Sequence, residues 1–103
     1  MIIYVDIDNT ITITEGMDYK NAKPVIYKID KINELYEKGN YIVYWTARGV
    51  GSGKDYFSLT EKQLNRWGCK YHELRLDKPV FDIFIDDKNL RDIDDIEKFN
   101  AIF

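Results

Sequence analysis

Acidic residues stand near both ends of the 103-residue chain, each group directly after an apolar run. Asp6 and Asp8 follow Ile-Ile-Tyr-Val, and Asp86 and Asp87 follow the run 81–85. Carboxylates gathered at one place repel one another, and desolvating them together is costly unless a cation binds among them. Carboxylates are hard oxygen ligands, which favour Mg²⁺ over zinc. The sequence has no Cys/His cluster, which indicates the same preference. The spacing therefore predicts a magnesium site, provided that the fold brings the two groups together.

These carboxylates, with Lys78 and Thr46, suit chemistry on a phosphate monoester. The dianionic substrate repels an attacking carboxylate unless positive charge lies nearby, and Mg²⁺ with the ammonium of Lys78 would supply that charge. Asp6 would attack phosphorus and form an aspartyl-phosphate, which replaces one difficult displacement with two easier ones. Asp8 would protonate the leaving oxygen and later take a proton from water. Thr46 would offer its hydroxyl and amide to the phosphate oxygens.

The segments between these residues predict strands that alternate with helices. Apolar runs predict the strands, and apolar spacings of three and four predict the helices. Strands are expected at residues 2–6, 41–45, 73–76 and 81–85, helices at 24–38 and 58–67, and a projecting hairpin, the flap, at 11–21. Such alternation predicts an α/β fold with a parallel sheet, in which the residues that follow each strand meet at one edge.

The order of these motifs resembles that of the haloacid dehalogenase superfamily. The matching residues are Asp6-Ile7-Asp8-Asn9-Thr10 after the first predicted strand, Thr46 after the second, then Lys78, then Asp86-Asp87 after the last. The order is the specific feature, because Asp-x-Asp and Asp-Asp pairs are common in surface loops. The resemblance spans nearly the whole chain and implies a Rossmann-like sheet.

The resemblance also implies a role for each matching residue. It implies Asp6 as nucleophile, Asp8 as general acid/base, and phosphate binding by Thr46, Ala47 and Lys78. It implies that Mg²⁺ is held by Asp6, the carbonyl of Asp8 and Asp86, with Thr10, Arg48 and Asp87 in supporting positions. The second aspartate of the first motif favours phosphatases over dehalogenases. For Arg48 the residues leave two partners open, a second anionic group of the substrate or a nearby carboxylate.

Four further stretches of sequence resemble a smaller group of proteins within this superfamily. They are Asn21-Ala22-Lys23-Pro24, Trp45-Thr46-Ala47-Arg48-Gly49, Leu59-Thr60-Glu61-Lys62-Gln63-Leu64 and Lys70-Tyr71-His72-Glu73-Leu74. They are similar to small bacterial phosphatases of capsule or surface-polysaccharide biosynthesis, which implies a sugar or polyol phosphate as a plausible substrate. The predicted elements fill the stretches between the motifs, so no cap domain fits. A homo-oligomer, in which a neighbouring subunit covers the open site, is therefore expected.

Composition and charge narrow the class of protein. Hydrophobic residues make up 45% of the chain and charged residues 32%, and the net charge is -3, with no basic run that would follow a nucleic-acid backbone. We expect one cytoplasmic domain over residues 1–103 that takes a small-molecule phosphate ester and has no nucleic-acid or membrane partner. The single cysteine, Cys69, is expected to be a buried filler rather than a nucleophile.

Three other functions stay open at this point. A receiver-like phosphoacceptor signalling domain also combines an acidic pair, Thr, Lys and Mg²⁺ on a parallel sheet, but its acidic pair follows the first strand, whereas here the pair comes last. A polynucleotide or protein phosphatase would fit an uncapped site, although the chain lacks a basic run for nucleic acid. A module that only binds a phospholigand is disfavoured by the presence of both Asp6 and Asp8.

Overall fold

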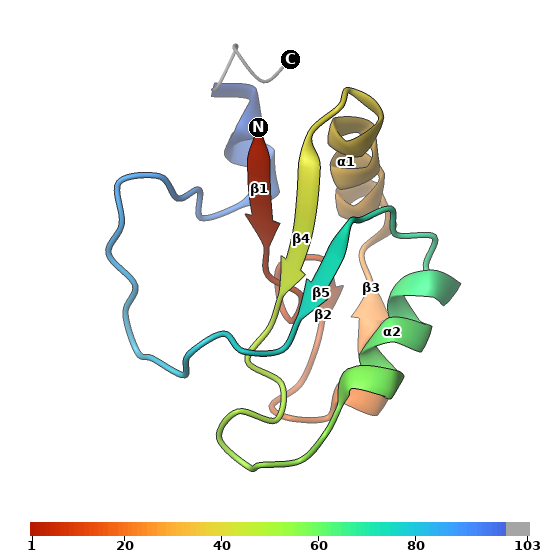
Figure 1. Cartoon of the computed structure of the whole chain (residues 1–103), viewed down its shortest axis with the longest axis vertical. Coiled ribbons are helices and arrows are strands. Elements are labelled where there is room, and N and C mark those ends of the chain that lie inside the picture. The colour runs from red at the N-terminus through yellow and green to blue at the C-terminus, as the bar shows by residue number, and fades with distance from the viewer. Residues whose placement is uncertain (99–103) are drawn as a thin grey trace.

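The computed structural model describes residues 1–98 and shows a three-stranded parallel sheet with two α-helices (Figure 1). The elements in chain order are β1 (Ile2–Val5), β2 (Thr12–Ile13), the 3-10 helix η1 (Tyr19–Asn21), β3 (Lys23–Pro24), α1 (Ile26–Glu37), β4 (Tyr41–Trp45), α2 (Phe57–Arg66), β5 (Glu73–Arg75) and the 3-10 helix η2 (Ile93–Lys98). The predicted α/β class with a parallel sheet is confirmed.

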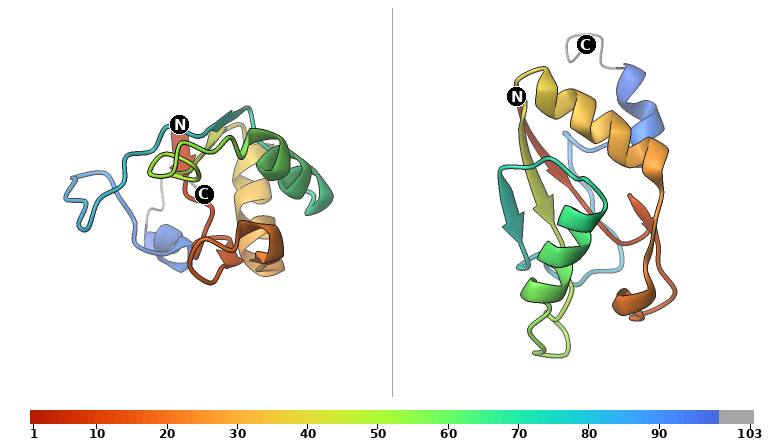
Figure 2. Two further views of the ribbon diagram at one scale, coloured as in Figure 1. Left: turned by 90° about the horizontal axis from the view of Figure 1, so that it is seen from below. Right: turned by 90° about the vertical axis from the view of Figure 1, so that its right-hand side faces the viewer.

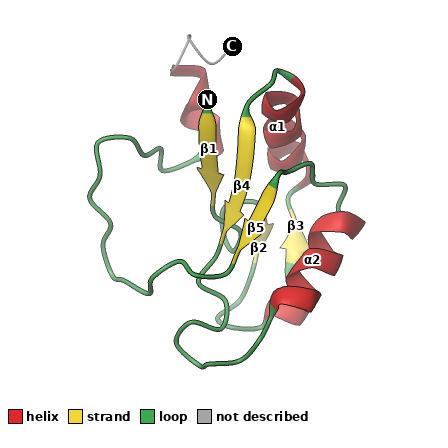
Figure 3. Cartoon of the chain, viewed as in Figure 1, coloured by secondary structure: helices red, strands yellow, loops and turns green. Residues whose placement is uncertain are grey.

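The sheet has the order β1-β4-β5, so that β4 lies in the centre. Ile2 lies opposite Tyr41 in the parallel pair of β1 and β4, and Val43 lies opposite Glu73 in that of β4 and β5. The three arrows of this sheet in Figure 3 accordingly point the same way. Because the strands are parallel, the residues that follow them meet at one end of the sheet.

The core lies between this sheet and the helices. Ile29, Ile32 and Leu35, three residues apart on α1, are buried against side chains of the strands and α2. The C-terminal helix η2 adds Ile93 and Ile96 to the same core, and Figure 2 shows it beside α1. Gly39 follows α1 with φ +94, the left-handed conformation in which glycine ends helices. Among residues 1–98 the helices are too short or too polar to cross a membrane.

The flap hairpin forms, but its threonines face inward and Ile13 faces solvent, whereas a surface strand usually buries its apolar side chains. β2 pairs antiparallel with β3, with Thr12 opposite Pro24. Thr12 and Thr14 are buried and their hydroxyls are hydrogen-bonded to each other, whereas Ile13 is exposed. Pro24 was expected to begin the first helix. It belongs instead to β3, because the amide of Val25 donates to the carbonyl of Ile11 (2.8 Å) and keeps this segment extended.

The fourth predicted strand, at 81–85, is wrong. In the described part of the chain, no residue between β5 and η2 belongs to a strand. We call residues 79–91 the arm. Figure 1 shows the arm leaving the carboxyl end of the sheet, running clear of the body and returning to η2 near the N-terminus. The run is apolar enough for a strand, but no neighbouring strand pairs with it.

Candidate active site

Asp6 and Lys78 meet at the carboxyl end of the sheet, although 72 positions separate them in the sequence. Lys78 Nζ lies 3.5 Å from Asp6 Oδ1. The amide of Lys78 donates to the carbonyl of Thr46 (3.2 Å), the residue after β4, and this bond fixes the lysine at the end of the central strand. The hydroxyl of Thr10 donates to Asp6 Oδ2 (3.3 Å). Both oxygens of the predicted nucleophile are therefore held.

The pKa of Asp6 reflects two opposing influences. Burial raises the pKa of this carboxyl above its ordinary value, because the charged form is partly withdrawn from water. The Lys78 ammonium lowers the pKa, and the nearby Asp8 raises it further. Burial is the largest cause, so the carboxyl is more easily protonated than a surface aspartate. A carboxylate with reduced hydration is also a less shielded nucleophile.

A pocket of about 240 Å³ opens over these residues. Six of the predicted site residues line it, namely Asp6, Asp8, Thr46, Ala47, Arg48 and Lys78. The rest of its lining is Gly16, Tyr19, Pro79, Val80 and Phe81. The pocket therefore brings the ends of β1 and β4, the flap and the first residues of the arm around one space.

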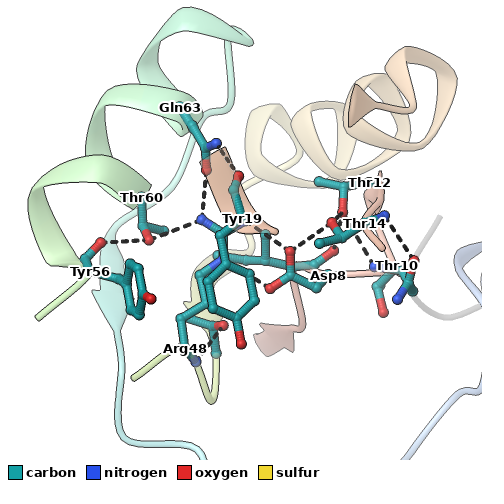
Figure 4. A network of polar contacts seen from close by, with 12 residues as sticks. Asp8, Thr10, Thr12, Thr14, Tyr19, Arg48, Tyr56, Thr60 and Gln63 are labelled. Carbon is teal, nitrogen blue, oxygen red and sulfur yellow. Dashed lines mark hydrogen bonds and ion pairs between the residues drawn. The ribbon is translucent and has the colours of Figure 1, made fainter. Parts of the chain in front are cut away.

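Arg48 binds Asp8 and is not free for a substrate. Its Nη2 donates to Asp8 Oδ1 (2.8 Å) and its Nε to Asp8 Oδ2 (2.9 Å), a two-point ion pair. Its Nη1 donates to Thr60 Oγ1 (3.1 Å) and to Gln63 Oε1 (2.6 Å). The residue is 2% exposed, and Figure 4 shows it beneath Tyr19. Of the two partners that the sequence left open, the structure selects the nearby carboxylate.

Four further side chains support this ion pair, and the sequence predicts a role for none of them. They are Thr14, Tyr19, Thr60 and Gln63. Thr14 Oγ1 donates to Asp8 Oδ1 (2.8 Å), and the ring of Tyr19 lies 4.9 Å from the Arg48 guanidinium carbon. Gln63 Nε2 also donates to the carbonyl of Tyr19 (2.7 Å), which ties the flap to α2. The alternation of Ile and Thr in the flap was the one available signal, but that alternation predicts only a hairpin and not a contact with Asp8.

Asp86 and Asp87 do not join the site. Both are exposed on the arm, where the amide of Asp87 donates to Asp86 Oδ1 (2.9 Å). Within residues 1–98, no three His, Cys, Asp or Glu side chains gather closely enough to hold a metal ion. The predicted magnesium ligands Asp6, Asp8 and Asp86 are thus not brought together in one chain. The physical reason is that the arm is unpaired, so its acidic end is not carried to the end of the sheet.

The comparisons with known proteins bear on the fold. No protein-family model matches the chain, and no curated protein does. A crystal structure of an MCSG target from Vibrio cholerae matches with a TM-score of 0.85 and 23% sequence identity, over 98% of this chain and 94% of that one. At that identity the likeness shows the fold alone, so the chemistry must be argued from the residues of this chain.

Cys69 takes no part in the site. It is buried in the core with Tyr44 and Leu64, and burial raises the pKa of its thiol to about 11. A thiol with so high a pKa is almost entirely protonated near neutral pH and is a poor nucleophile. The prediction that Cys69 is a buried filler is therefore confirmed.

Proposed function

We propose that this chain is a phosphomonoesterase of the haloacid dehalogenase superfamily, which passes the phosphoryl group through Asp6. The observation that supports the proposal most is the contact of 3.5 Å between Lys78 Nζ and Asp6 Oδ1 at the rim of the pocket. A partly buried carboxylate can attack phosphorus, and the ammonium beside it can balance the charge of the phosphate. Thr46 and Ala47, which line the same pocket, suit contacts with the phosphate oxygens.

In the proposed first step, a carboxylate oxygen of Asp6 forms a bond to phosphorus while the bond from phosphorus to the ester oxygen breaks. The departing oxygen takes a proton from Asp8 and leaves as an alcohol. Lys78 stabilises the charge on the non-bridging oxygens, where it is largest in the transition state. The products of this step are the free alcohol and an aspartyl-phosphate at Asp6.

In the second step, water attacks phosphorus and gives its proton to Asp8, and the bond from phosphorus to Asp6 breaks. Asp8 has room for this proton. A carboxylate offers about four lone-pair positions. Two donors, Arg48 Nη2 and Thr14 Oγ1, occupy Oδ1, whereas Oδ2 accepts from Arg48 Nε. Arg48 therefore fixes the direction of the remaining lone pair and acts as a positioning residue.

The form of the pocket favours a small substrate. Its volume of about 240 Å³ lies below the range of roughly 300–1,000 Å³ that is usual for pockets of drug-sized ligands. Tyr19 and Phe81 supply aromatic surface at its rim. With the resemblance to polysaccharide-biosynthesis phosphatases, this supports a sugar or polyol phosphate as the substrate class. Magnesium dependence is proposed from the resemblance alone, because the described residues of a single chain do not assemble the expected ligands.

A phosphatase assay tests the function. Purified protein is given p-nitrophenyl phosphate and a panel of phosphorylated metabolites, with Mg²⁺ and with EDTA, and released phosphate is measured. We expect turnover by the native chain and none by Asp6→Asn. Asp30→Asn, on the exposed face of α1, is the matched control and should behave as the native chain. Equal phosphate release by Asp6→Asn and the native protein would remove Asp6 from the mechanism.

A further inference from the structure

The outer edge of β1 has no strand partner in the described chain. Its four residues are uncharged, and Ile2 and Tyr4 are 71% and 47% exposed. Free strand edges invite pairing, and proteins commonly protect them with charged residues. The opposite edge of the sheet, β5, has such protection in Glu73 and Arg75. The edge of β1 has none.

The arm has the complementary property, because it is a strand-forming segment without a sheet. Residues 81–85 read Phe-Asp-Ile-Phe-Ile, which is rich in β-branched and aromatic side chains. Ile83 and Ile85 are 79% and 92% exposed. Contiguous exposed apolar side chains of this kind mark interaction sites. The arm and the edge of β1 are thus two unpaired parts of one sheet.

One parallel register pairs the arm with β1 and buries its apolar side chains. Along β1 the side chains alternate, and Ile3 and Val5 face the core. Ile83 and Ile85 alternate in the same way, so both reach the core side when they lie beside Ile3 and Val5. A shift by one residue would turn Asp82 toward the core, which is costly for an unpaired carboxylate.

The same register places Asp86 beside Asp6. Residues that follow neighbouring parallel strands meet at one end of the sheet, and here that end carries the pocket. Asp86 would therefore add a third carboxylate to Asp6 and Asp8, and residues 1–98 of a single chain hold no such group of three.

An arm cannot reach this register on its own β1. Lys78 is bound at the carboxyl end of β4 through the carbonyl of Thr46. In this register Asp82 would have to lie beside Ile2. From Lys78 this position is about five residues back along the sheet and at least two strand spacings across it. With a rise of about 3.3 Å per residue and a spacing of about 4.8 Å between strands, the distance is about 19 Å. The four residues from Lys78 to Asp82 span at most about 14 Å when fully extended.

The direction of the arm points to a second copy of the chain. In Figure 1 the arm runs from the carboxyl end of the sheet back toward the amino end of β1, which is opposite to the direction of its own β1. A two-fold axis normal to the sheet reverses the second copy, so that the second copy's β1 runs parallel to this arm. Such an exchange is reciprocal and closed, as in most symmetric dimers.

We propose that two copies of this chain exchange arms. The arm of each copy adds a strand to β1 of the other copy and carries Asp86 to that copy's Asp6 and Asp8. The dimer buries the isoleucines of both arms, covers both open edges and completes two sites. The strand exchange rests on the geometry above, whereas the value of Asp86 at the site rests on the proposed function.

Disulfide trapping tests the exchange without reference to activity. In the proposed register Tyr4 lies beside Phe84, at a separation that a disulfide can bridge. The variant Tyr4→Cys/Phe84→Cys, made with Cys69→Ser, is oxidised and its mass is determined without reductant. We expect a covalent dimer. The control Ile26→Cys/Phe84→Cys, with an exposed partner position on α1, should stay uncrosslinked. A disulfide within one chain, or no covalent dimer, would overturn the exchange.

Complementation tests whether the exchanged arm completes the site. Asp6→Asn and Asp86→Asn are each expected to be inactive. When equal amounts are unfolded and refolded together, half of the dimers combine the two variants, and one of the two sites in each then has both aspartates. About one quarter of native turnover should return, as random reciprocal pairing requires.

If covalent dimers form and the native chain is active, but the mixture stays inactive, Asp86 does not complete the partner's site. If the native chain shows no turnover, the proposed function fails and the trapping result still decides the exchange.

Discussion

Arg48 holds both carboxylate oxygens of Asp8, at 2.8 and 2.9 Å, from a position that is almost fully buried. The remaining nitrogen of its guanidinium is bound to Thr60 and Gln63 of α2. Through Arg48, Asp8 is thereby connected to a helix that begins 49 residues further along the chain. This buried ion pair can act both on stability and on the direction of the carboxylate that we propose as the general acid/base, and the two contributions can be separated.

The first prediction separates them with Arg48→Ala and Arg48→Lys. Removing one partner of a buried ion pair leaves the other charge uncompensated, so Arg48→Ala should lower the free energy of unfolding by about 3 kcal/mol. Arg48→Lys keeps the charge but cannot make the two-point contact, so it should recover much of the stability and little of kcat. Urea unfolding and steady-state assays measure the two. Arg66→Ala, on the exposed face of α2, is the control. Equal recovery of stability and kcat by lysine would mean that the geometry of the contact does not matter.

The second prediction concerns the bond between the flap and α2. Gln63 donates to the carbonyl of Tyr19 and accepts from Arg48, so Gln63→Leu removes both contacts at similar volume. Arg48 Nη1 keeps Thr60, and the carbonyl of Tyr19 keeps the amide of Ala22 (3.1 Å), so each lost hydrogen bond should cost about 1 kcal/mol. We expect faster amide exchange over residues 15–21 with little change in α1. Gln63→Glu keeps the acceptor for Arg48 but loses the donor to Tyr19, so this variant should weaken the contact with the flap more than the contact with Arg48. Unchanged exchange over the flap in Gln63→Leu would show that other contacts hold it.

The third prediction follows from the raised pKa of Asp6. A raised pKa means that the folded state binds the proton more tightly than the unfolded state, so stability falls as pH rises from the ordinary value of 3.8 through the raised value. Asp6→Asn, which carries no charge, should therefore be more stable than the native chain at pH 7. The difference should vanish below pH 3.8. Thermal unfolding at both pH values measures it, and a native chain that is the more stable one at pH 7 would contradict the burial of Asp6.

Local patterns were sufficient for most of the fold. The strand at 41–45 was predicted with its exact bounds, and both helices were predicted to within about two residues, because apolar periodicity is a property of the segment itself. The sequence also predicted which site residues meet, since parallel strands bring the residues that follow them to one end of the sheet. These residues are Asp6, Asp8, Thr46 and Lys78.

The arm and the flap show where local patterns fail. Residues 81–85 have the composition of a strand, but a strand needs a neighbour, and in the described chain no strand pairs with this segment. In the flap, the alternation of Ile and Thr gives the period of two without saying which side faces inward. Thr12 and Thr14 face inward because Asp8 and the loop before them offer hydrogen-bond partners.

The last prediction concerns Lys78. Its ammonium is the first cause that lowers the pKa of Asp6, so Lys78→Met should raise that pKa further. Because Asp6 must be ionised to attack, the acidic limb of the pH–rate profile should move to higher pH in this variant. Turnover at the optimum should fall by about 10²–10³, the usual effect of losing one group that stabilises transition-state charge. Lys62→Met, exposed on α2, is the matched control. Lys78→Arg should keep the acidic limb near its native position, since the charge is retained. A fall in turnover with an unmoved acidic limb in Lys78→Met would place the lysine on the phosphate alone and leave the ionisation of Asp6 to other groups.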